Sequence, residues 1–134
     1  MGEKILFELV SPAKLLSSEA VEMVVVPGAE GDFGAMPRHA PFISGVRPGV
    51  IDVYQDGKVT DRIFVDGGFS EVTGERITVL AEEAIKVSEI TQDLIAKREA
   101  DARASAEAAK TETEKDHAAH KAMVVEALRS ASAR

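Results

Sequence analysis

The chain has 134 residues, 45% of them hydrophobic and 29% charged, which is the composition of a globular protein with one domain or one domain and an appendage. A net charge of −7 and 4% aromatic residues disfavour a nucleic-acid or anionic-membrane partner, and the lack of cysteine excludes disulfides and thiolate chemistry. The strongest apolar run, residues 23–26, is too short to span a bilayer, and residues 1–4 do not resemble a secretory signal, so we expect neither.

Glycine and proline divide the chain into two parts. All 10 glycines and all 5 prolines lie at or before Gly74, whereas residues 88–134 contain 13 alanines and neither of those residue types. Turn-rich sequence favours short strands, and Ala-rich sequence without Gly favours helices. We therefore predict a β domain at residues 1–87 and a helical segment at 88–134.

The first part shows a period of two, which is typical of strands that bury one face. Asp56 and Gly57 stand between two such runs and predict a tight hairpin, and Gly74 predicts another turn. These features predict an antiparallel sandwich or barrel. The alternating residues, in chain order, are Ile5, Phe7, Leu9; Val21, Met23, Val25; Val59, Ile63, Val65; and Ile77, Val79, Ala81.

Residues 27–41 (PGAEGDFGAMPRHAP) have glycine at every third position, followed by two prolines that bracket His39. The glycine spacing does not match a phosphate-binding loop, and Glu30 and Asp32 would repel a phosphate. We expect a stiff connecting loop with special backbone angles that is suited to protein contact.

The second part predicts a helical hairpin. Thr91 is a candidate N-cap, with Asp93 in the first turn, and Thr111 with Glu114 has the spacing of a capping box. The helices should cover about residues 91–109 and 113–130. Few large apolar side chains are available to hold them together, and alanines supply much of the seam, so the hairpin should open at modest cost. The large residues are Ile90, Leu94, Ile95, Met123, Val124, Val125 and Leu128; the alanines are Ala102, Ala106, Ala109, Ala118 and Ala122.

Candidate catalytic and metal-binding residues are few. His39 could act as a base with Asp32 or Ser44, but no nucleophile elbow accompanies it, and an interface histidine is favoured. His117 and His120 share a helix face, yet a zinc site needs further ligands. We expect no cofactor, no metal and no catalytic residue, and we interpret the chain as an interaction module.

Several blocks of sequence, in order, resemble the epsilon subunit of bacterial F-type ATP synthases. The family loop P/T-G-x-E-G-x-x-G-x-x-P-x-H-A-P is matched at residues 27–41. Similar blocks are LVSP at 9–12, VRPGVI at 46–51, VDGGFSEV at 65–72 and ITVLAE at 77–82. Because the likeness covers residues 5–86 and rests on no single block, it is specific.

The resemblance implies a ten-stranded β-sandwich followed by a C-terminal helical hairpin, in a non-catalytic subunit of the central stalk. It implies binding to the gamma subunit near Ser11, His39 and Ser44, and to the c-ring through Glu30 and Asp32. It also implies a peripheral location at the cytoplasmic face of the bacterial inner membrane. A β-sandwich adaptor of an unrelated assembly is the alternative.

The helical part departs from the family pattern. Relatives that bind ATP carry I/L-D-x-x-R-A, whereas here Thr91 replaces the Asp and Leu94 replaces the Arg, so we predict no tight ATP binding. In many relatives the hairpin extends, contacts the alpha and beta subunits and blocks ATP hydrolysis. The same role here is a hypothesis, with Lys115, Lys121 and Arg129 as the contacting cations, offset by Glu114, Asp116 and Glu126.

Overall fold

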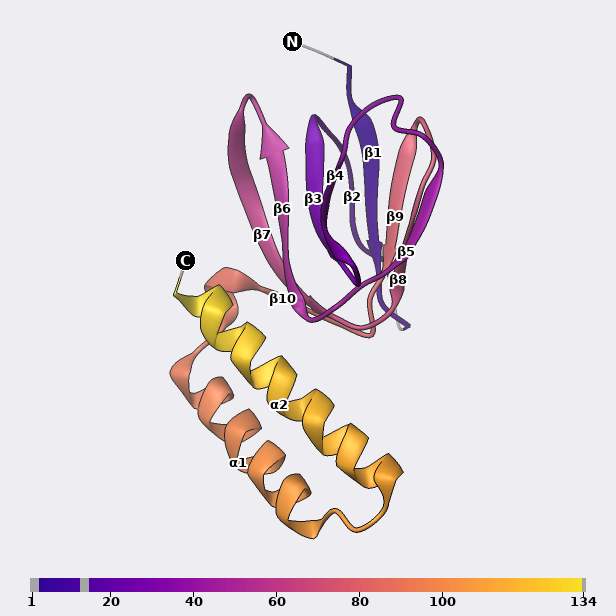
Figure 1. Cartoon of the computed structure of the whole chain (residues 1–134). Helices are drawn as coiled ribbons and strands as arrows, with labels where there is room; N and C mark the ends of the chain where they lie inside the picture. Colours follow the sequence, from indigo (N-terminus) through magenta and orange to yellow (C-terminus); the bar gives the residue numbers. More distant parts are fainter. Residues whose placement is uncertain (1–2, 13–14, 134) are drawn as a thin grey trace. The chain divides into compact units, whose positions relative to one another are not determined.

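The computed structural model of the chain describes residues 3–12 and 15–133. It divides into two compact units, Met1–Lys86 and Val87–Arg134 (Figure 1). Strands make up the first unit and helices the second. The division falls where the sequence changes from turn-rich to Ala-rich.

One sheet of the first unit, sheet A, has five strands in the order β2-β1-β9-β8-β5. Their bounds are β1 Ile5–Val10, β2 Leu15–Val21, β5 Phe42–Gly45, β8 Phe69–Val72 and β9 Arg76–Leu80. Neighbouring strands are antiparallel except β1 and β9, which run parallel. Among the described strands, this parallel pair departs from the predicted antiparallel sandwich.

The other sheet, sheet B, has five antiparallel strands in the order β10-β7-β6-β3-β4. Their bounds are β3 Met23–Gly28, β4 Gly31–Ala35, β6 Gly49–Gln55, β7 Lys58–Asp66 and β10 Glu83–Lys86. The described residues thus form ten strands in two sheets, and the predicted fold class is confirmed.

The core lies between the sheets and follows from the period of two. On β1, Ile5, Phe7 and Leu9 are at most 1% exposed, while the residues between them are half-buried. The same alternation on the other strands completes one cluster within the first unit. Its further members are Val21, Val24, Val26, Ala35, Val46, Ile51, Val53, Ile63, Val65, Val72, Ile77, Val79 and Ala81.

The predicted turn between β6 and β7 is confirmed. Asp56 and Gly57 have φ angles of 54° and 73°, the pair of positive values that a two-residue turn needs to match the strand twist. Asp tolerates this conformation better than most residues, and glycine adopts it freely.

Two predicted faces are corrected by the structure. The chain leaves sheet A after Val21 and enters sheet B at Met23, so Val24 and Val26 are buried in place of Met23 and Val25. On β7, a bulge shifts the register so that Val59 pairs with Tyr54. Val59 therefore does not share the buried face of Ile63 and Val65. Both errors came from extending one alternation across an irregularity.

Residues 27–41 are not a connecting loop throughout, because their first half is a β-hairpin. β3 continues to Gly28, a turn follows at Ala29 and Glu30, and β4 begins at Gly31. A Cβ on Gly28 would lie 2.6 Å from the carbonyl oxygen of Gly31, so the hairpin closes only with glycine at that position. Gly28 therefore reflects a narrow hairpin.

The second unit begins with a short 3-10 helix, η1 Val87–Glu89, and continues with α1 Gln92–Ala108 and α2 Glu112–Ser132. Thr91 caps α1, since its hydroxyl accepts a hydrogen bond from the Leu94 N–H at 3.1 Å. Thr111 caps α2, and the Glu114 carboxylate accepts the Thr111 N–H at 3.1 Å in return. The predicted caps are confirmed, and α2 extends two residues beyond its predicted end.

The seam between α1 and α2 is less continuous than predicted. Ala102 and Ala118 are buried, but Ala106 and Ala122 are exposed. Met123, expected among the large residues that hold the helices, is 55% exposed. Side chains of one carbon do not reach across between two helices, so part of the seam stays open.

Candidate interaction surfaces

Four apolar side chains lie in one row across the outer face of sheet A. The register pairs Phe69 on β8 with Leu80 on β9. On β1, Val10 pairs with both Leu80 and Leu15. Phe69 is 50% exposed, Leu80 38% and Leu15 55%, and none of the three belongs to the core. We call these four residues the apolar row. A contiguous exposed apolar row is typical of a surface that another protein covers.

The next row on the same face mixes apolar and acidic side chains. Ile43, which is 69% exposed, pairs with Glu71, and Glu71 pairs with Thr78. Thr78 in turn pairs with Glu8, whose carboxylate forms an ion pair with Arg76 at 3.5 Å. A partner that covers the apolar row therefore meets carboxylates beside it.

The three residues assigned by resemblance to the gamma interface lie in three segments of the chain. Ser11 follows β1 and is half-buried. Ser44 is on β5, where its hydroxyl donates to the Gly45 carbonyl at 2.8 Å. His39 lies before β5, with its Nδ1 2.6 Å from the Ala40 carbonyl oxygen and its ring 6.2 Å from that of Phe42. The three residues therefore come from the end of β1, the chain before β5, and β5 itself.

The two residues assigned to the c-ring have different environments. Glu30 is at the exposed turn of the β3–β4 hairpin, whereas Asp32 is on β4 and accepts a hydrogen bond from the Arg47 guanidinium. Arg47 also donates to the Gly28 carbonyl at 2.5 Å. Arg47 thus connects the hairpin to the chain before β6 and forms an ion pair with Asp32. Glu30 remains as the carboxylate at the tip of the hairpin.

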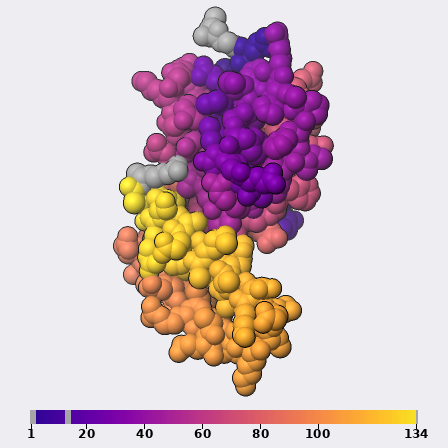
Figure 2. Space-filling view, viewed as in Figure 1, coloured from indigo at the N-terminus to yellow at the C-terminus, as the bar shows by residue number. Residues whose placement is uncertain are grey.

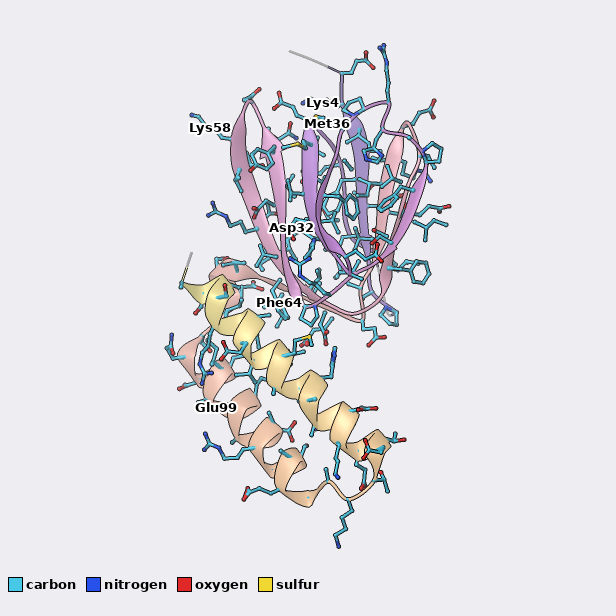
Figure 3. The ribbon with its side chains drawn as sticks, viewed as in Figure 1. Lys4, Asp32, Met36, Lys58, Phe64 and Glu99 are labelled. Atoms are coloured by element: carbon cyan, nitrogen blue, oxygen red, sulfur yellow. The ribbon has the colours of Figure 1, made fainter. Side chains whose placement is uncertain are left out.

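The hairpin and the segment after it supply much of the surface on the side of the first unit that faces the viewer, in purple (Figure 2). Asp32 and Met36 lie toward different ends of the sandwich (Figure 3). The acidic turn is therefore separate from the end at which β4 leaves its sheet.

Ion pairs cross between the two helices. Arg129 on α2 donates to the Glu99 carboxylate on α1, and Lys121 on α2 contacts Asp101 and the Ser105 hydroxyl, both at 2.9 Å. Of the three cations predicted to contact other subunits, Lys121 and Arg129 therefore bind α1. Among the described residues, Lys115 contacts Glu112 on its own helix, at the longer distance of 3.9 Å.

The electrostatics of the hairpin follow from these contacts. The hydrogen bond from Arg129, and then its charge, lower the pKa of Glu99, and the same bond raises the pKa of Arg129. The backbone N–H groups of Lys110 and Thr111 lower the pKa of Glu114. Glu99 and Glu114 thus stay charged at neutral pH, and the ion pair between Glu99 and Arg129 persists there.

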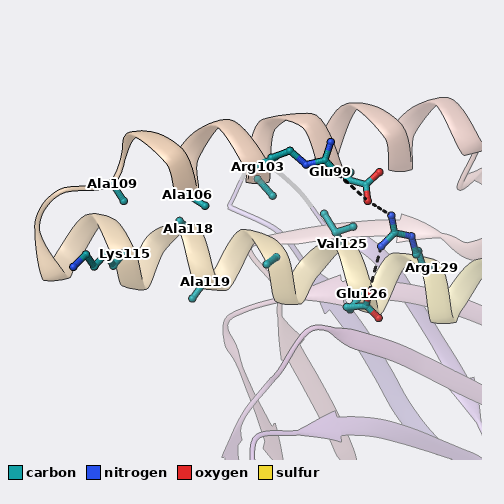
Figure 4. A pocket seen from close by; sticks show the side chains of 12 residues that line it. Glu99, Arg103, Ala106, Ala109, Lys115, Ala118, Ala119, Val125, Glu126 and Arg129 are labelled. Atoms are coloured by element: carbon teal, nitrogen blue, oxygen red, sulfur yellow. Dashed lines mark hydrogen bonds and ion pairs between the residues drawn. The ribbon is translucent and has the colours of Figure 1, made fainter.

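A groove of about 500 Å³ runs beside this seam (Figure 4). Alanines from both helices line its floor, and Arg103, Glu99 and Arg129 stand at one end of it.

The start of α1 is where the sequence differs from the family ATP motif. Thr91 acts as the N-cap of the helix and Leu94 is half-buried. Neither of these two positions carries a charge.

The candidate base His39 has no catalytic neighbour. Within residues 3–12 and 15–133, neither Asp32 nor Ser44 hydrogen-bonds its ring, and Asp32 is bound by Arg47. Across the same residues no group of three or more metal-ligating side chains gathers, and His117 and His120 are exposed.

Neither helix in the described part of the chain has the length and apolar content to cross a bilayer.

Exposed apolar and acidic surfaces such as these are typical of a protein that binds other proteins. A family model described as "ATP synthase, Delta/Epsilon chain, beta-sandwich domain" matches residues 4–87. The ATP synthase epsilon chain of Paramagnetospirillum magneticum is 57% identical over 133 residues, which cover 99% of this chain and 100% of that one. The epsilon chain of Rhodospirillum rubrum is 54% identical and covers 98% of each.

The chain belongs to the family of ATP synthase epsilon chains. It is a non-catalytic subunit of the ATP synthase complex. The resemblance that the sequence blocks indicated is therefore confirmed, and an adaptor of an unrelated assembly is no longer an alternative.

Solved structures share the fold. A chain of the Euglena gracilis mitochondrial ATP synthase, solved as OSCP, F1 and c-ring, has a TM-score of 0.80 at 24% identity and covers 98% of this chain and 82% of that one. A chain of the Tetrahymena thermophila mitochondrial ATP synthase central stalk and c-ring has a TM-score of 0.75 at 15% identity, with 97% of each chain covered. At these identities the likeness concerns the fold alone.

Sequence reasoning missed the apolar row and Arg47. The row joins residues from four strands, and no local pattern marks it. Arg47 lies in the block at 46–51 that resembled the family, yet its contact with Asp32, 15 positions away, depends on the hairpin register.

Proposed function

We propose that this chain is a rotor subunit in the central stalk of a bacterial ATP synthase, where it binds the gamma subunit and rests on the c-ring. The observation that carries the proposal is the exposed apolar row on sheet A in a member of this family. In this role the chain transmits rotation between proton flow and the catalytic sites, while its partners perform the chemistry.

The apolar row is the surface that we assign to gamma. Burying a Leu or Phe side chain stabilises a complex by about 1.5–3 kcal/mol, so three such residues can anchor a subunit. Ser44 and Ser11 are next to this row in the chain, since Gly45 pairs with Phe69 and Ser11 follows Val10. Ser44 itself pairs with the buried Ser70, so it is on the other face of β5, and we assign it to the edge of the interface. His39 lies beyond it, and we assign it to the margin of the same interface.

Binding to gamma is tested by titrating the full chain with the gamma subunit of the same organism. Replacing Phe69 by Ala should weaken binding by about tenfold or more, which corresponds to about 1.4 kcal/mol or above. Met36→Ala is the matched control, because Met36 is 52% exposed and lies outside the row. Equal loss from both variants, or none from Phe69→Ala, would contradict the assignment.

For the c-ring we assign the exposed turn of the β3–β4 hairpin. Arg47 binds Asp32 and not Glu30, so Glu30 can contact polar loops of a partner without losing a contact that stabilises the fold. We place the protein at the cytoplasmic face of the bacterial membrane, held there through its partners.

For the helical hairpin we propose inhibition of ATP hydrolysis. Lys121 and Arg129 bind α1 in the closed pair of helices, and separation of the helices would release both cations for acidic surfaces of the alpha and beta subunits. The open groove and the exposed alanines support a modest cost of separation.

Truncation after Ser88 should raise the ATPase activity of the assembled complex. A double variant, with Lys121→Gln and Arg129→Gln together in the full chain, should reproduce part of that increase, since it removes the cations proposed to bind the alpha and beta subunits without shortening the chain. Unchanged activity in the truncated complex would remove the inhibitory role.

We also propose that the hairpin binds no ATP tightly, because Thr91 and Leu94 replace the charged residues of the family motif. Isothermal titration of the full chain should show no binding at micromolar ATP. Micromolar affinity would contradict this proposal.

A further inference from the structure

The outer face of sheet A has a hollow of about 520 Å³ next to the apolar row. Its lining residues come from β1, β8, β9 and the turn between the last two strands, and they are Leu6, Glu71, Thr73, Glu75, Arg76 and Thr78. We propose that this hollow receives a lysine or arginine side chain of the partner that covers the apolar row. The inference rests on the proposed binding of gamma and names the chemistry of the contact.

The position of Glu71 carries the argument. Glu71 pairs with Ile43 across the strands and lies two residues from Phe69 on the same face of β8. Same-face neighbours along a strand are about 7 Å apart. A protein that covers Phe69 and Ile43 must therefore also cover the Glu71 carboxylate and remove its water.

The described residues leave the two carboxylates of the hollow without a cation of their own. Arg76, the basic side chain in the hollow, forms its ion pair with Glu8. No described residue forms an ion pair with Glu71 or Glu75, and both residues are exposed. In the free protein water solvates them.

Covering these carboxylates without compensation would oppose binding, since a desolvated charge without a partner is strongly unfavourable. A cation from the partner removes this cost and also fixes the orientation of the complex. Lysine and arginine have stems long enough to enter the hollow while their apolar parts contact the neighbouring row.

The same charges argue against a second copy of this chain as the occupant. The net charge is −7, and pairing two copies through this face would bring Glu71 and Glu75 of each copy to a surface with the same excess of carboxylates. A basic partner surface fits both the hollow and the row.

The test uses a double variant that carries both Glu71→Gln and Glu75→Gln. This variant and the unchanged full chain are each titrated with gamma at low and at high salt. The double variant should bind about tenfold more weakly at low salt, and its affinity should depend less on salt than that of the unchanged chain. Glu19→Gln is the control, because it removes one exposed carboxylate of β2 and should change affinity by less than about twofold.

The outcomes separate the two proposals. If Phe69→Ala weakens binding while the double variant binds as before with the same salt dependence, the basic contact is wrong and the gamma interface stands. If the unchanged chain does not bind gamma, the proposed function itself fails. Dimerisation of the isolated chain that Phe69→Ala abolishes, seen by sedimentation, would overturn the choice of a basic partner in favour of a second copy.

Discussion

Arg47 shows how one side chain separates two neighbouring acids that the sequence presents as equivalent. Its guanidinium binds Asp32 and the Gly28 carbonyl, so it joins both strands of the β3–β4 hairpin. Glu30 stays at the exposed turn. We therefore expect Asp32 to hold the hairpin in place and Glu30 to contact a partner.

This difference predicts distinct effects of two similar substitutions. Asp32→Asn should lower the melting temperature of the isolated chain, because it removes the charge that the Arg47 guanidinium binds. Arg47→Ala should lower it at least as much, because it removes the contacts with both Asp32 and the Gly28 carbonyl. Glu30→Gln should leave the melting temperature unchanged and weaken association with c-ring preparations. Thermal unfolding and co-sedimentation measure the two effects, and a drop in stability for Glu30→Gln would contradict the division of roles.

Gly68 is a residue at which the backbone tolerates no side chain. Its φ is +89°, and a Cβ would lie 1.7 Å from the Leu80 carbonyl oxygen on the neighbouring strand. Gly68→Ala should therefore prevent the β8–β9 pairing and leave the chain largely unfolded. Gly57→Ala is the comparison, because Gly57 has φ +73° with open space around it. The free energy of unfolding of Gly57→Ala should fall by only about 1–2 kcal/mol. Denaturant unfolding measures both variants, and similar losses of stability for the two would contradict the steric explanation.

At the scale of elements, the helical hairpin depends on ionised carboxylates at both ends. Glu99 binds Arg129 across the helices, and Glu114 closes the capping box of α2. Their pKa values are lowered from 4.5. A carboxyl with a lowered pKa in the folded state stabilises that state above its unfolded pKa and loses this contribution as the pH falls through the folded value.

Helicity should therefore fall when the pH is lowered below about 4.5, where these carboxyls begin to take up protons. Glu99→Gln should be less helical at neutral pH and should lose less helicity on acidification, because it has no proton to gain at that position. Far-UV circular dichroism of the full chain during acid titration measures both. The same acid dependence in the variant and the unchanged chain would show that the Arg129 contact contributes nothing.

Elements set by local residues were predictable from the sequence. The caps at Thr91 and Thr111 depend on contacts three residues away, and the turn at Asp56 and Gly57 on two residues, so their patterns are complete within a short window. The β3–β4 hairpin was missed because Gly, Pro and Asp usually mark loops, whereas here the close approach of the backbone at Gly31 requires glycine at position 28.

The surfaces were less predictable than the elements. The apolar row exists only when β8, β9, β1 and β2 stand in register, and that register depends on contacts between distant residues. A one-residue change of pairing would turn each side chain to the other face. Family resemblance indicated residues for the proposed gamma interface, but not which of them share a face.

For the whole molecule, the first unit has all of its core cluster within residues 5–81. We therefore expect the chain truncated after Ser88 to fold into the sandwich by itself and to unfold cooperatively. Thermal unfolding followed by circular dichroism should show a single β transition. A truncated chain with no cooperative transition would mean that the sandwich needs the helices to fold, and the activity test of the truncation would then lose its basis.

The parallel pair of β1 and β9 joins residues 6–10 to residues 76–80. During synthesis the first strand can form a hairpin with β2 early, but its other edge has no neighbour until β9 has left the ribosome. Closure of the sandwich is therefore a late event that waits for nearly the whole first unit, and pairing over such a separation in sequence is slow. Until then the edge of β1 is open to chaperones, and to pairing with other nascent chains.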